Sequence, residues 1–158
     1  MYRVLFVCTG NLYRSPLSAA LFLKKLHADG LADSWIVESA GTWTFPGRPI
    51  PLHALKAARE FGIELKDHRT RPVHLAMLET YDLILVMETG QREALGIEYP
   101  SVQDKVHLLS ELADQLKYDI PDPAKSRQDI RQVIAAMSGL IDRAYPRICQ
   151  FLLFREPY

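Results

Sequence analysis

The sequence has little cysteine and no excess of charge of either sign. Its 158 residues include two cysteines, Cys8 and Cys149, which are too few for a disulfide scaffold. Its 19 lysines and arginines balance its 19 aspartates and glutamates, so no net charge draws the whole molecule to nucleic acid or to an anionic membrane. The first residues do not form a secretory segment, and we expect a cytoplasmic protein, with signal-less secretion left open. Because the charges balance over the whole chain, any anion-binding site must depend on a local cluster of positive groups.

The signatures of nucleotide and metal sites are also missing. Neither Gly-x-x-x-x-Gly-Lys nor Gly-x-Gly-x-x-Gly follows the first apolar run, which counts against a nucleotide-binding protein. The five histidines are scattered singly, without the spacing of metal ligands. We expect no metal, no cofactor and no nucleic-acid or membrane partner, and we leave the oligomeric state open. The length and the average composition predict one domain, residues 1–158.

Strand patterns alternate with helix patterns along the chain. Short apolar runs predict strands over residues 3–7, 35–39, 82–87 and 106–109. Helical spacing predicts a helix that begins at Ser15 as N-cap and stops at Gly30, a second that ends at Gly62 and a short third over residues 91–95. Strands joined by helical crossovers require a parallel sheet with helices on both faces, and ligands bind beyond the carboxyl ends of its strands.

An apolar stripe near the end of the chain predicts a long helix that packs on the core. Ser126 is its expected N-cap, and Asp129 lies in its expected first turn. A proline inside a helix removes a hydrogen bond, so we expect a kink or an end at Pro146. Cys149 falls in this region and is interpreted as a buried core thiol rather than a redox partner.

The segment after the first strand, Cys8-Thr-Gly-Asn-Leu-Tyr-Arg14-Ser-Pro, carries the chemistry. A loop of this length can wrap its backbone N–H groups around a tetrahedral oxyanion, while the helix dipole and Arg14 add positive charge. The same field stabilises a thiolate, which makes Cys8 a candidate nucleophile. Gly10 and Asn11 tolerate positive φ, and Ser15 can donate to the sulfur or cap the helix. A lone cysteine is usually an inert core residue, but here its neighbours all suit one anion cradle.

This segment resembles the phosphate-binding loop of the low-molecular-weight protein tyrosine phosphatases. The resemblance extends to Glu38-Ser-Ala-Gly41, Gly62-Ile63, His68-Arg69, the run from Tyr81 to Met87 and Ile120-Pro-Asp-Pro123. It implies an α/β fold, a flavodoxin-like three-layer sandwich with a four-stranded parallel sheet. It also implies metal-free hydrolysis of a phosphate monoester through a phosphocysteine, with protein phosphotyrosine as the first expected substrate.

The resemblance further implies roles for individual residues. Asp122 matches the general acid of the family, with Asp119 as a nearby alternative, and Ser39 and His68 match residues that hold the loop from behind. The expected catalytic residues are Cys8, Arg14 and Asp122, and the expected phosphate- or substrate-binding residues are Thr9, Gly10, Asn11, Leu12, Tyr13, Ser15 and Phe45.

Two departures from the family pattern bear on redox protection and on substrate. Tyr13 stands where many relatives have a second cysteine, so a protective disulfide with Cys8 is lost. Ala124 and Lys125 stand where many relatives have aromatic residues that stack on the phosphotyrosine ring. Apolar walls can come instead from Leu12, Tyr13, Trp43 and Phe45, and a positive charge that attracts acidic substrates can come from Arg48 or Lys125.

Three alternative functions remain open at this point. One is a phosphatase for a smaller or more acidic phosphomonoester that is not a protein. Another is an arsenate reductase, although such an enzyme relays oxidation through further cysteines and here only Cys149 is available. The last is a non-catalytic phosphate-binding module, against which the presence of Cys8, Arg14 and Asp122 together argues.

Overall fold

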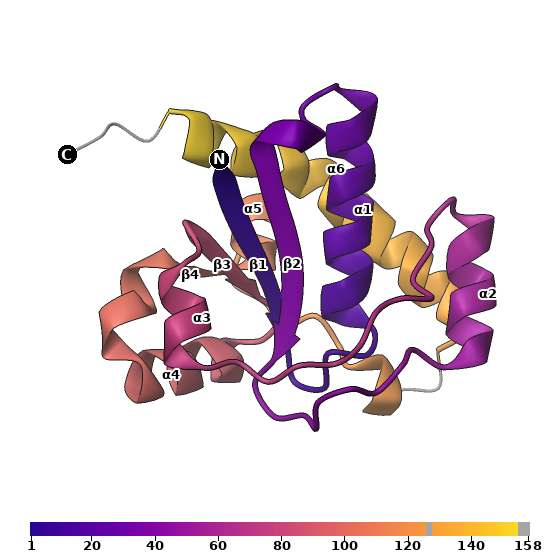
Figure 1. Cartoon of the computed structure of the whole chain (residues 1–158), viewed down its shortest axis with the longest axis horizontal. Coiled ribbons are helices and arrows are strands. Elements are labelled where there is room, and N and C mark those ends of the chain that lie inside the picture. Colours follow the sequence, from indigo (N-terminus) through magenta and orange to yellow (C-terminus); the bar gives the residue numbers. More distant parts are fainter. Residues whose placement is uncertain (126–127, 155–158) are drawn as a thin grey trace.

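A four-stranded parallel sheet forms the centre of the molecule (Figure 1). The computed structural model describes residues 1–125 and 128–154. The strands are β1 (Tyr2–Cys8), β2 (Trp35–Gly41), β3 (Leu83–Val86) and β4 (Val106–Leu108), and their order in the sheet is β2-β1-β3-β4. This order, with helical crossovers between parallel strands, confirms the α/β, flavodoxin-like architecture expected from the sequence.

The central strand β1 is buried on both faces, which explains its continuous apolar run. Val4 and Phe6 pack into the core on one face of the sheet, and Leu5 and Val7 pack into the core on the other. All four are fully buried. A parallel strand of this kind needs helices on both sides, because neither face is left for water.

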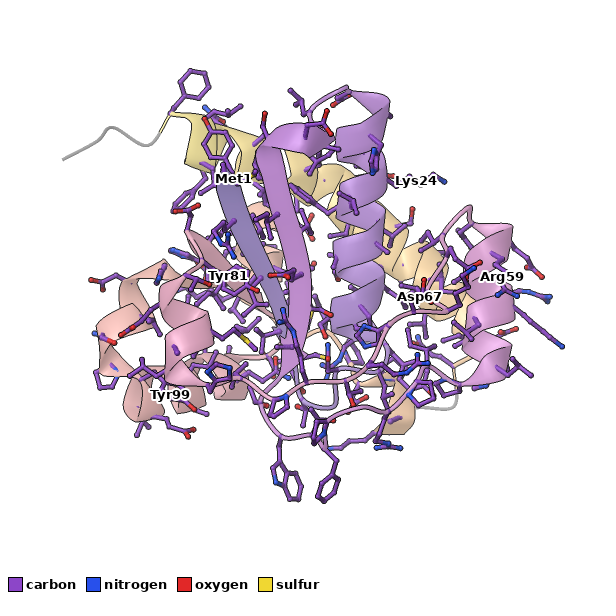
Figure 2. All side chains as sticks on the ribbon, in the orientation of Figure 1. Met1, Lys24, Arg59, Asp67, Tyr81 and Tyr99 are labelled. Carbon is purple, nitrogen blue, oxygen red and sulfur yellow. The ribbon has the colours of Figure 1, made fainter. Side chains whose placement is uncertain are left out.

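Helices cover both faces of the sheet and complete three layers (Figure 1). On the face of Val4 and Phe6 lie α1 (Arg14–Ala28), α2 (Leu52–Glu60), α5 (Leu109–Asp114) and α6 (Ile130–Leu153). On the face of Leu5 and Val7 lie α3 (Leu75–Glu79) and α4 (Thr89–Glu98). Short 3-10 helices span Ala32–Ser34, Pro100–Lys105 and Pro123–Lys125. Side chains fill the space between the layers (Figure 2).

The starts of α1 and α6 differ from the sequence predictions, and α4 (Thr89–Glu98) is longer at both ends than the predicted 91–95. Helix α1 begins at Arg14 and its N-cap position is Tyr13, so the prediction of Ser15 as N-cap was wrong. The Ser15 hydroxyl is instead committed to the interior of the Cys8 loop. Helix α6 begins at Ile130, and Asp129 is its N-cap rather than a first-turn residue, since its carboxylate accepts from the N–H of Arg131. The predicted N-cap Ser126 lies outside the described residues.

Helix α6 continues past Pro146 to Leu153, so the helix does not end at the proline. Pro146 lies on the exposed side of the helix, while Ile148 and Leu152 beyond it are buried in the core. Burial of this apolar stripe offsets the roughly 3 kcal/mol that an interior proline costs.

Cys149 on α6 is buried, as expected from the sequence. None of the described helices combines the length and the hydropathy needed to cross a membrane.

Candidate active site

The residues from Cys8 to Arg14, the Cys8 loop, leave the carboxyl end of β1 and enter the first turn of α1. Cys8 is the last residue of β1 and is 2% exposed. Gly41, at the end of the neighbouring β2, lies against this loop so closely that an added Cβ would be 2.6 Å from the carbonyl oxygen of Thr9. The loop therefore sits at the sheet edge where parallel α/β folds bind ligands.

Asn11 holds the Cys8 loop in its curled shape from inside. Its backbone has φ of 57°, a left-handed conformation that asparagine tolerates better than most residues. Its side-chain Nδ2 donates to Ser15 Oγ at 2.9 Å and to Ser39 Oγ at 3.0 Å. Its backbone carbonyl accepts from His68 Nε2 at 2.8 Å. The structure thus brings Asn11, Ser15, Ser39 and His68 together behind the loop.

His68 carries its proton on Nε2, because the Asn11 carbonyl oxygen can only accept. Burial lowers the pKa of His68, the hydrogen bond to Asn11 opposes this, and the positive charges of Arg69 and Arg71 lower it further. The imidazole therefore stays neutral near pH 7 and acts as a hydrogen-bond donor to the loop.

Three loop residues leave backbone donors available at a small pocket. Within the described part of the chain, the backbone N–H groups of Gly10, Leu12 and Tyr13 donate to no protein acceptor, and the three residues are half-buried. N–H groups without a protein partner, next to one thiol and a helix N-terminus, suit an anionic ligand. The pocket, of about 50 Å³, is lined by Cys8, Gly10, Leu12, Tyr13, Arg14, Asp122 and Ala124.

Ser15 contacts the sulfur directly, with 3.0 Å between Ser15 Oγ and Cys8 Sγ. The hydroxyl oxygen already accepts a hydrogen from Asn11 Nδ2, so its own hydrogen is free to point elsewhere. Cys8 Sγ is the near acceptor, and the carbonyl of Ala40, at 3.4 Å, is the more distant one. Ser15 can therefore donate to a Cys8 thiolate.

Arg14 is a buried cation, 2% exposed, at the wall of the pocket. Its Nη1 donates to the carbonyl of Ile120 at 2.7 Å and lies 3.2 Å from Glu88 Oε2. Its Nη2 lies 3.6 Å from Asp122 Oδ2, which is beyond hydrogen-bond distance. The guanidinium is thus fixed at one end and keeps donors for a bound oxyanion at the other.

The two candidate acids occupy different places. Asp122 lines the pocket and is partly buried, and its Oδ1 accepts from the N–H of Ala124 at 3.0 Å. Asp119 is exposed, and its Oδ1 accepts from the N–H of Thr89 at the start of α4. Of the two, Asp122 lies beside Arg14 and the sulfur.

Glu88 and Gln91 also belong to the site, and the sequence did not single them out. Gln91 is 5% exposed, and its Oε1 accepts from the N–H groups of Met87 and Glu88. Its Nε2 donates to Thr9 Oγ1 at 3.0 Å and to Glu88 Oε2 at 2.9 Å. This one amide fixes Thr9, the loop residue next to Cys8, and orients the carboxylate that pairs with Arg14. The only signal in the sequence was their position directly after the third buried run.

The remaining expected residues lie further from the sulfur. Trp43 and Phe45 are 86% and 79% exposed, and neither is among the residues that line the pocket. Their loop nevertheless contacts the Cys8 loop, because the N–H of Trp43 donates to the Thr9 carbonyl at 3.1 Å. Arg48 and Lys125 are exposed. All four side chains are exposed and none lines the pocket, so they are not placed to contact a phosphate inside it.

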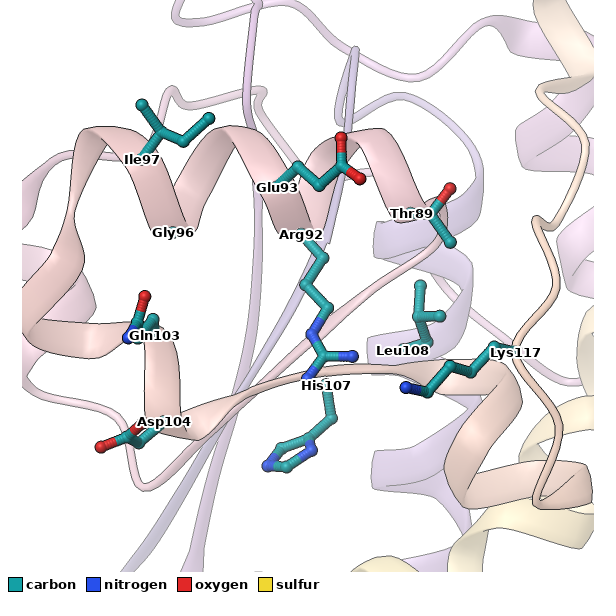
Figure 3. Close-up of a pocket in the computed structure, with 10 residues that line it drawn as sticks. All are labelled: Thr89, Arg92, Glu93, Gly96, Ile97, Gln103, Asp104, His107, Leu108 and Lys117. Atoms are coloured by element: carbon teal, nitrogen blue, oxygen red, sulfur yellow. The ribbon is translucent and has the colours of Figure 1, made fainter.

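A larger cavity, of about 700 Å³, lies between α4 and β4 (Figure 3). Arg92 extends into it toward His107, and Lys117 reaches in from the segment after α5. Glu93 and Asp104 also line it, and Arg92 already pairs with Glu111 at 3.0 Å. The positive and negative side chains offset one another, so this cavity has no field that favours an anion, in contrast to the Cys8 pocket.

Comparison with known proteins agrees with this geometry. The chain matches the family described as low molecular weight phosphotyrosine protein phosphatase over residues 3–149. It is 32% identical to a protein-arginine-phosphatase of Geobacillus stearothermophilus over 143 residues, covering 90% of this chain and 93% of that protein. It is 33% identical to the low molecular weight protein-tyrosine-phosphatase Etp of Escherichia coli over 141 residues, covering 89% of this chain and 88% of that protein.

Solved structures give the same answer for the fold. A YwlE mutant from Bacillus subtilis superposes with a TM-score of 0.85 and 30% identity over 94% of this chain and 99% of that one. A low molecular weight protein tyrosine phosphatase from T. tengcongensis superposes with a TM-score of 0.83 and 33% identity over 93% and 99% of the two chains. With the family match spanning nearly the whole sequence, this chain belongs to the low molecular weight phosphotyrosine protein phosphatase family.

Proposed function

We propose that the protein hydrolyses phosphate monoesters, with Cys8 as the nucleophile, and that protein phosphotyrosine is its substrate class. One observation carries the proposal. Cys8 Sγ lies 3.0 Å from a hydroxyl that can donate to it, inside a loop with free backbone N–H groups and beside the buried guanidinium of Arg14. This arrangement suits a thiolate and a tetrahedral phosphate in one small space.

In the first step the Cys8 thiolate attacks phosphorus in line with the ester oxygen. The S–P bond forms as the P–O bond breaks, and the loop N–H groups with Arg14 stabilise the negative charge on the three equatorial oxygens. Asp122, protonated at this point, gives its proton to the departing oxygen of the alcohol or phenol. The product is a phosphocysteine, with Asp122 left as a carboxylate.

In the second step a water molecule attacks the phosphocysteine. The Asp122 carboxylate takes a proton from this water as the new O–P bond forms and the S–P bond breaks. Phosphate is released, and Ser15 stabilises the returning thiolate by donating its hydroxyl hydrogen. The cycle uses no electron donor or acceptor, so Tyr13 in place of a second cysteine does not impair it.

The walls of the pocket favour an aryl phosphate. Leu12 and Tyr13 line it beside Cys8, and Ala124 leaves room on the Asp122 side. Apolar walls stabilise a tyrosine ring by burying it, whereas they give no partner to a charged guanidinium group. Trp43 and Phe45, exposed on the adjacent loop, can contact the protein around the phosphorylated residue.

Phosphoarginine is the second candidate, because relatives at about one-third identity are named protein-arginine-phosphatases. The observation in its favour is the carboxylate of Asp122, which lines the pocket and can accept from a substrate guanidinium. Phosphotyrosine and phosphoarginine peptides of the same sequence decide between them. We expect a higher kcat/KM for the phosphotyrosine peptide, and the reverse order would assign the protein to the arginine-phosphatases.

The arsenate reductase alternative requires a second reactive thiol. Burial raises the pKa of Cys149, the other cysteine, and its thiol contacts Tyr145 on α6. A buried, protonated thiol is a poor partner for disulfide exchange. This favours hydrolysis over a thiol relay.

Turnover of p-nitrophenyl phosphate at mildly acidic to neutral pH tests the enzymatic proposal. We expect activity that persists in excess EDTA, because the proposed steps use a thiolate and a carboxylate rather than a metal-bound water. Purified, folded protein without such activity would leave the phosphate-binding module as the better interpretation.

A further inference from the structure

Residues 68–73, which we call the strap, run beside the carboxyl end of β2 and against the Cys8 loop. The N–H of Gly41 donates to the carbonyl of Arg71 at 2.9 Å, and the N–H of Val73 donates to the carbonyl of Gly41 at 2.9 Å. The N–H of Arg71 donates to Asn11 Oδ1 at 3.0 Å. The strap thus connects the sheet edge to the residue that shapes the loop.

The Arg71 side chain folds back from the strap onto β2. Its Nε donates to the carbonyl of Ser39 at 2.9 Å, and its Nη2 donates to Tyr81 Oη at 3.0 Å and lies 3.6 Å from Glu38 Oε2. Tyr81 in turn donates to Glu38 through a short hydrogen bond. Tyr81, labelled in Figure 2, lies just before β3. One planar guanidinium therefore ties the strap to two segments of the sheet.

These contacts decide which way the Asn11 amide faces. Because Arg71 N–H is a donor, the Asn11 atom that it meets must be the oxygen. Both hydrogens of the amide nitrogen then point to Ser15 Oγ and Ser39 Oγ. A Cys8 thiolate can only accept, so the Ser15 hydroxyl hydrogen then points at Cys8 Sγ rather than at the more distant carbonyl of Ala40.

We infer that Arg71 is a positioning residue for the Cys8 thiolate. Arg71 bonds to both partners of the Asn11–Ser39 hydrogen bond. Its side chain donates to the Ser39 carbonyl, and its backbone N–H donates to the Asn11 amide oxygen. The series of hydrogen bonds from Arg71 through Asn11 to Ser15 orients the Ser15 hydroxyl as a donor to the Cys8 sulfur. The inference rests on the proposed function in taking Cys8 as the nucleophile, and it adds a residue outside the Cys8 loop to the machinery.

Arg71→Met, which keeps the length of the side chain and removes its donors, tests the inference. The rate of Cys8 alkylation by iodoacetate, followed against pH, reports on the thiolate without any phosphatase substrate. We expect the midpoint of this profile to rise by about one pH unit, and kcat on p-nitrophenyl phosphate to fall about tenfold. A protein that proved not to be a phosphatase would still give the alkylation result.

The matched control is Arg69→Met, on the same strap. The Arg69 guanidinium donates to the carbonyls of Lys66 and His68, and among the described residues it donates to neither β2 nor Asn11. We expect the Arg69 variant to keep the wild-type alkylation profile. An equal rise in both variants would attribute the effect to general loosening of the strap and overturn the inference.

A double substitution separates positioning from loosening. If Arg71 acts through Ser15, Arg71→Met adds nothing further to the alkylation midpoint in a Ser15→Ala background. A full additional shift in that background, or an unchanged midpoint in Arg71→Met alone, would contradict the inference. Should Arg71→Met fail to fold, Arg71→Lys decides the matter: its ammonium cannot reproduce the guanidinium fork, so we expect the same rise, and a wild-type profile would contradict it.

Discussion

Arg14 carries a permanent charge at 2% exposure, which would cost several kcal/mol of free energy if it were unpaired. Glu88 and the Ile120 carbonyl satisfy one nitrogen, while the contact with Asp122 is too long for a hydrogen bond. The pairing is therefore incomplete on the side that faces the pocket. Under the proposed function a bound phosphate would complete it, which accounts for a buried arginine in this position.

Cys8→Ser separates binding from chemistry at the sulfur. The substitution keeps the loop N–H groups and Arg14, so we expect vanadate binding to remain, but a hydroxyl is a far weaker nucleophile than a thiolate and turnover should fall to background. Calorimetry with vanadate and p-nitrophenyl phosphate turnover measure the two properties. Cys149→Ser, at the other cysteine, is the control and should remain active. Substantial turnover by the Cys8 variant would exclude Cys8 as the nucleophile.

Asp122→Ala tests the general acid. Loss of a proton donor should slow phosphotyrosine, whose phenolate is a poor leaving group, by roughly 10²–10⁴-fold, and the activated p-nitrophenyl phosphate much less. Steady-state kinetics on the two substrates give this ratio. Asp119→Ala is the comparison, since Asp119 bonds to α4 instead of lining the pocket. A dependence on the leaving group that appeared in the Asp119 variant would move the acid to that residue.

At the level of elements, the start of α4 is a structural part of the site. Gln91 joins β3, α4 and the Cys8 loop with one buried amide. Gln91→Ala leaves the N–H groups of Met87 and Glu88 and the hydroxyl of Thr9 without this partner. We expect a loss of about 1–3 kcal/mol in the free energy of unfolding and a lower kcat. Urea unfolding and p-nitrophenyl phosphate kinetics measure both.

Glu93→Ala, on the same helix but exposed, is the matched control for Gln91→Ala. It should change the free energy of unfolding by no more than about 0.5 kcal/mol, as surface substitutions usually do. Equal stability of the two variants would show that the Gln91 amide does not fasten the loop to α4.

The elements that could be predicted from the sequence are those whose burial leaves a continuous pattern. β1 and β3 were predicted because each is a continuous apolar run, and α6 because its apolar residues recur at helical spacing, although Asp129 was misplaced in its first turn. α5 was missed because it follows β4 without a turn residue, so the apolar run of Val106 to Leu109 hides the change from strand to helix. Ser15 was misread as N-cap because a local pattern does not reveal the sulfur and the amide that compete for its hydroxyl.

The candidate site was predictable to the same extent. The Cys8 loop is contiguous in sequence, and its residue types all suit one geometry. Gln91 and Arg71 were not predictable, since each acts through partners that only the fold brings near. A glutamine or an arginine in isolation carries no sign of which carbonyl or hydroxyl it will meet.

At the scale of the whole molecule, the balance of charge conceals a local field. The chain has equal numbers of acidic and basic residues, yet the amino end of α1, the free N–H groups of the loop and Arg14 converge on one sulfur. The helix N-terminus contributes about half a unit of positive charge. Attraction of a phosphate is thus short-ranged, and under the proposed function we expect specificity for a protein substrate to depend on the exposed loop of Trp43 and Phe45.

The global stability should weaken in mild acid, because folding holds His68 neutral. Its folded pKa lies below the ordinary histidine value of 6.5, chiefly through burial, so between these two values the unfolded chain binds a proton that the folded chain does not. The free energy of unfolding therefore falls as pH decreases through 6.5 toward the folded pKa and levels off below it.

His68→Gln, whose amide can still donate to the Asn11 carbonyl, removes this titration and should flatten the dependence of the free energy of unfolding on pH. Urea unfolding of wild type and variant at several pH values from about 5 to 8 measures it. His53→Gln, at an exposed histidine of α2, controls for loss of an imidazole. A His68 variant with the wild-type slope would place the acid sensitivity elsewhere in the fold.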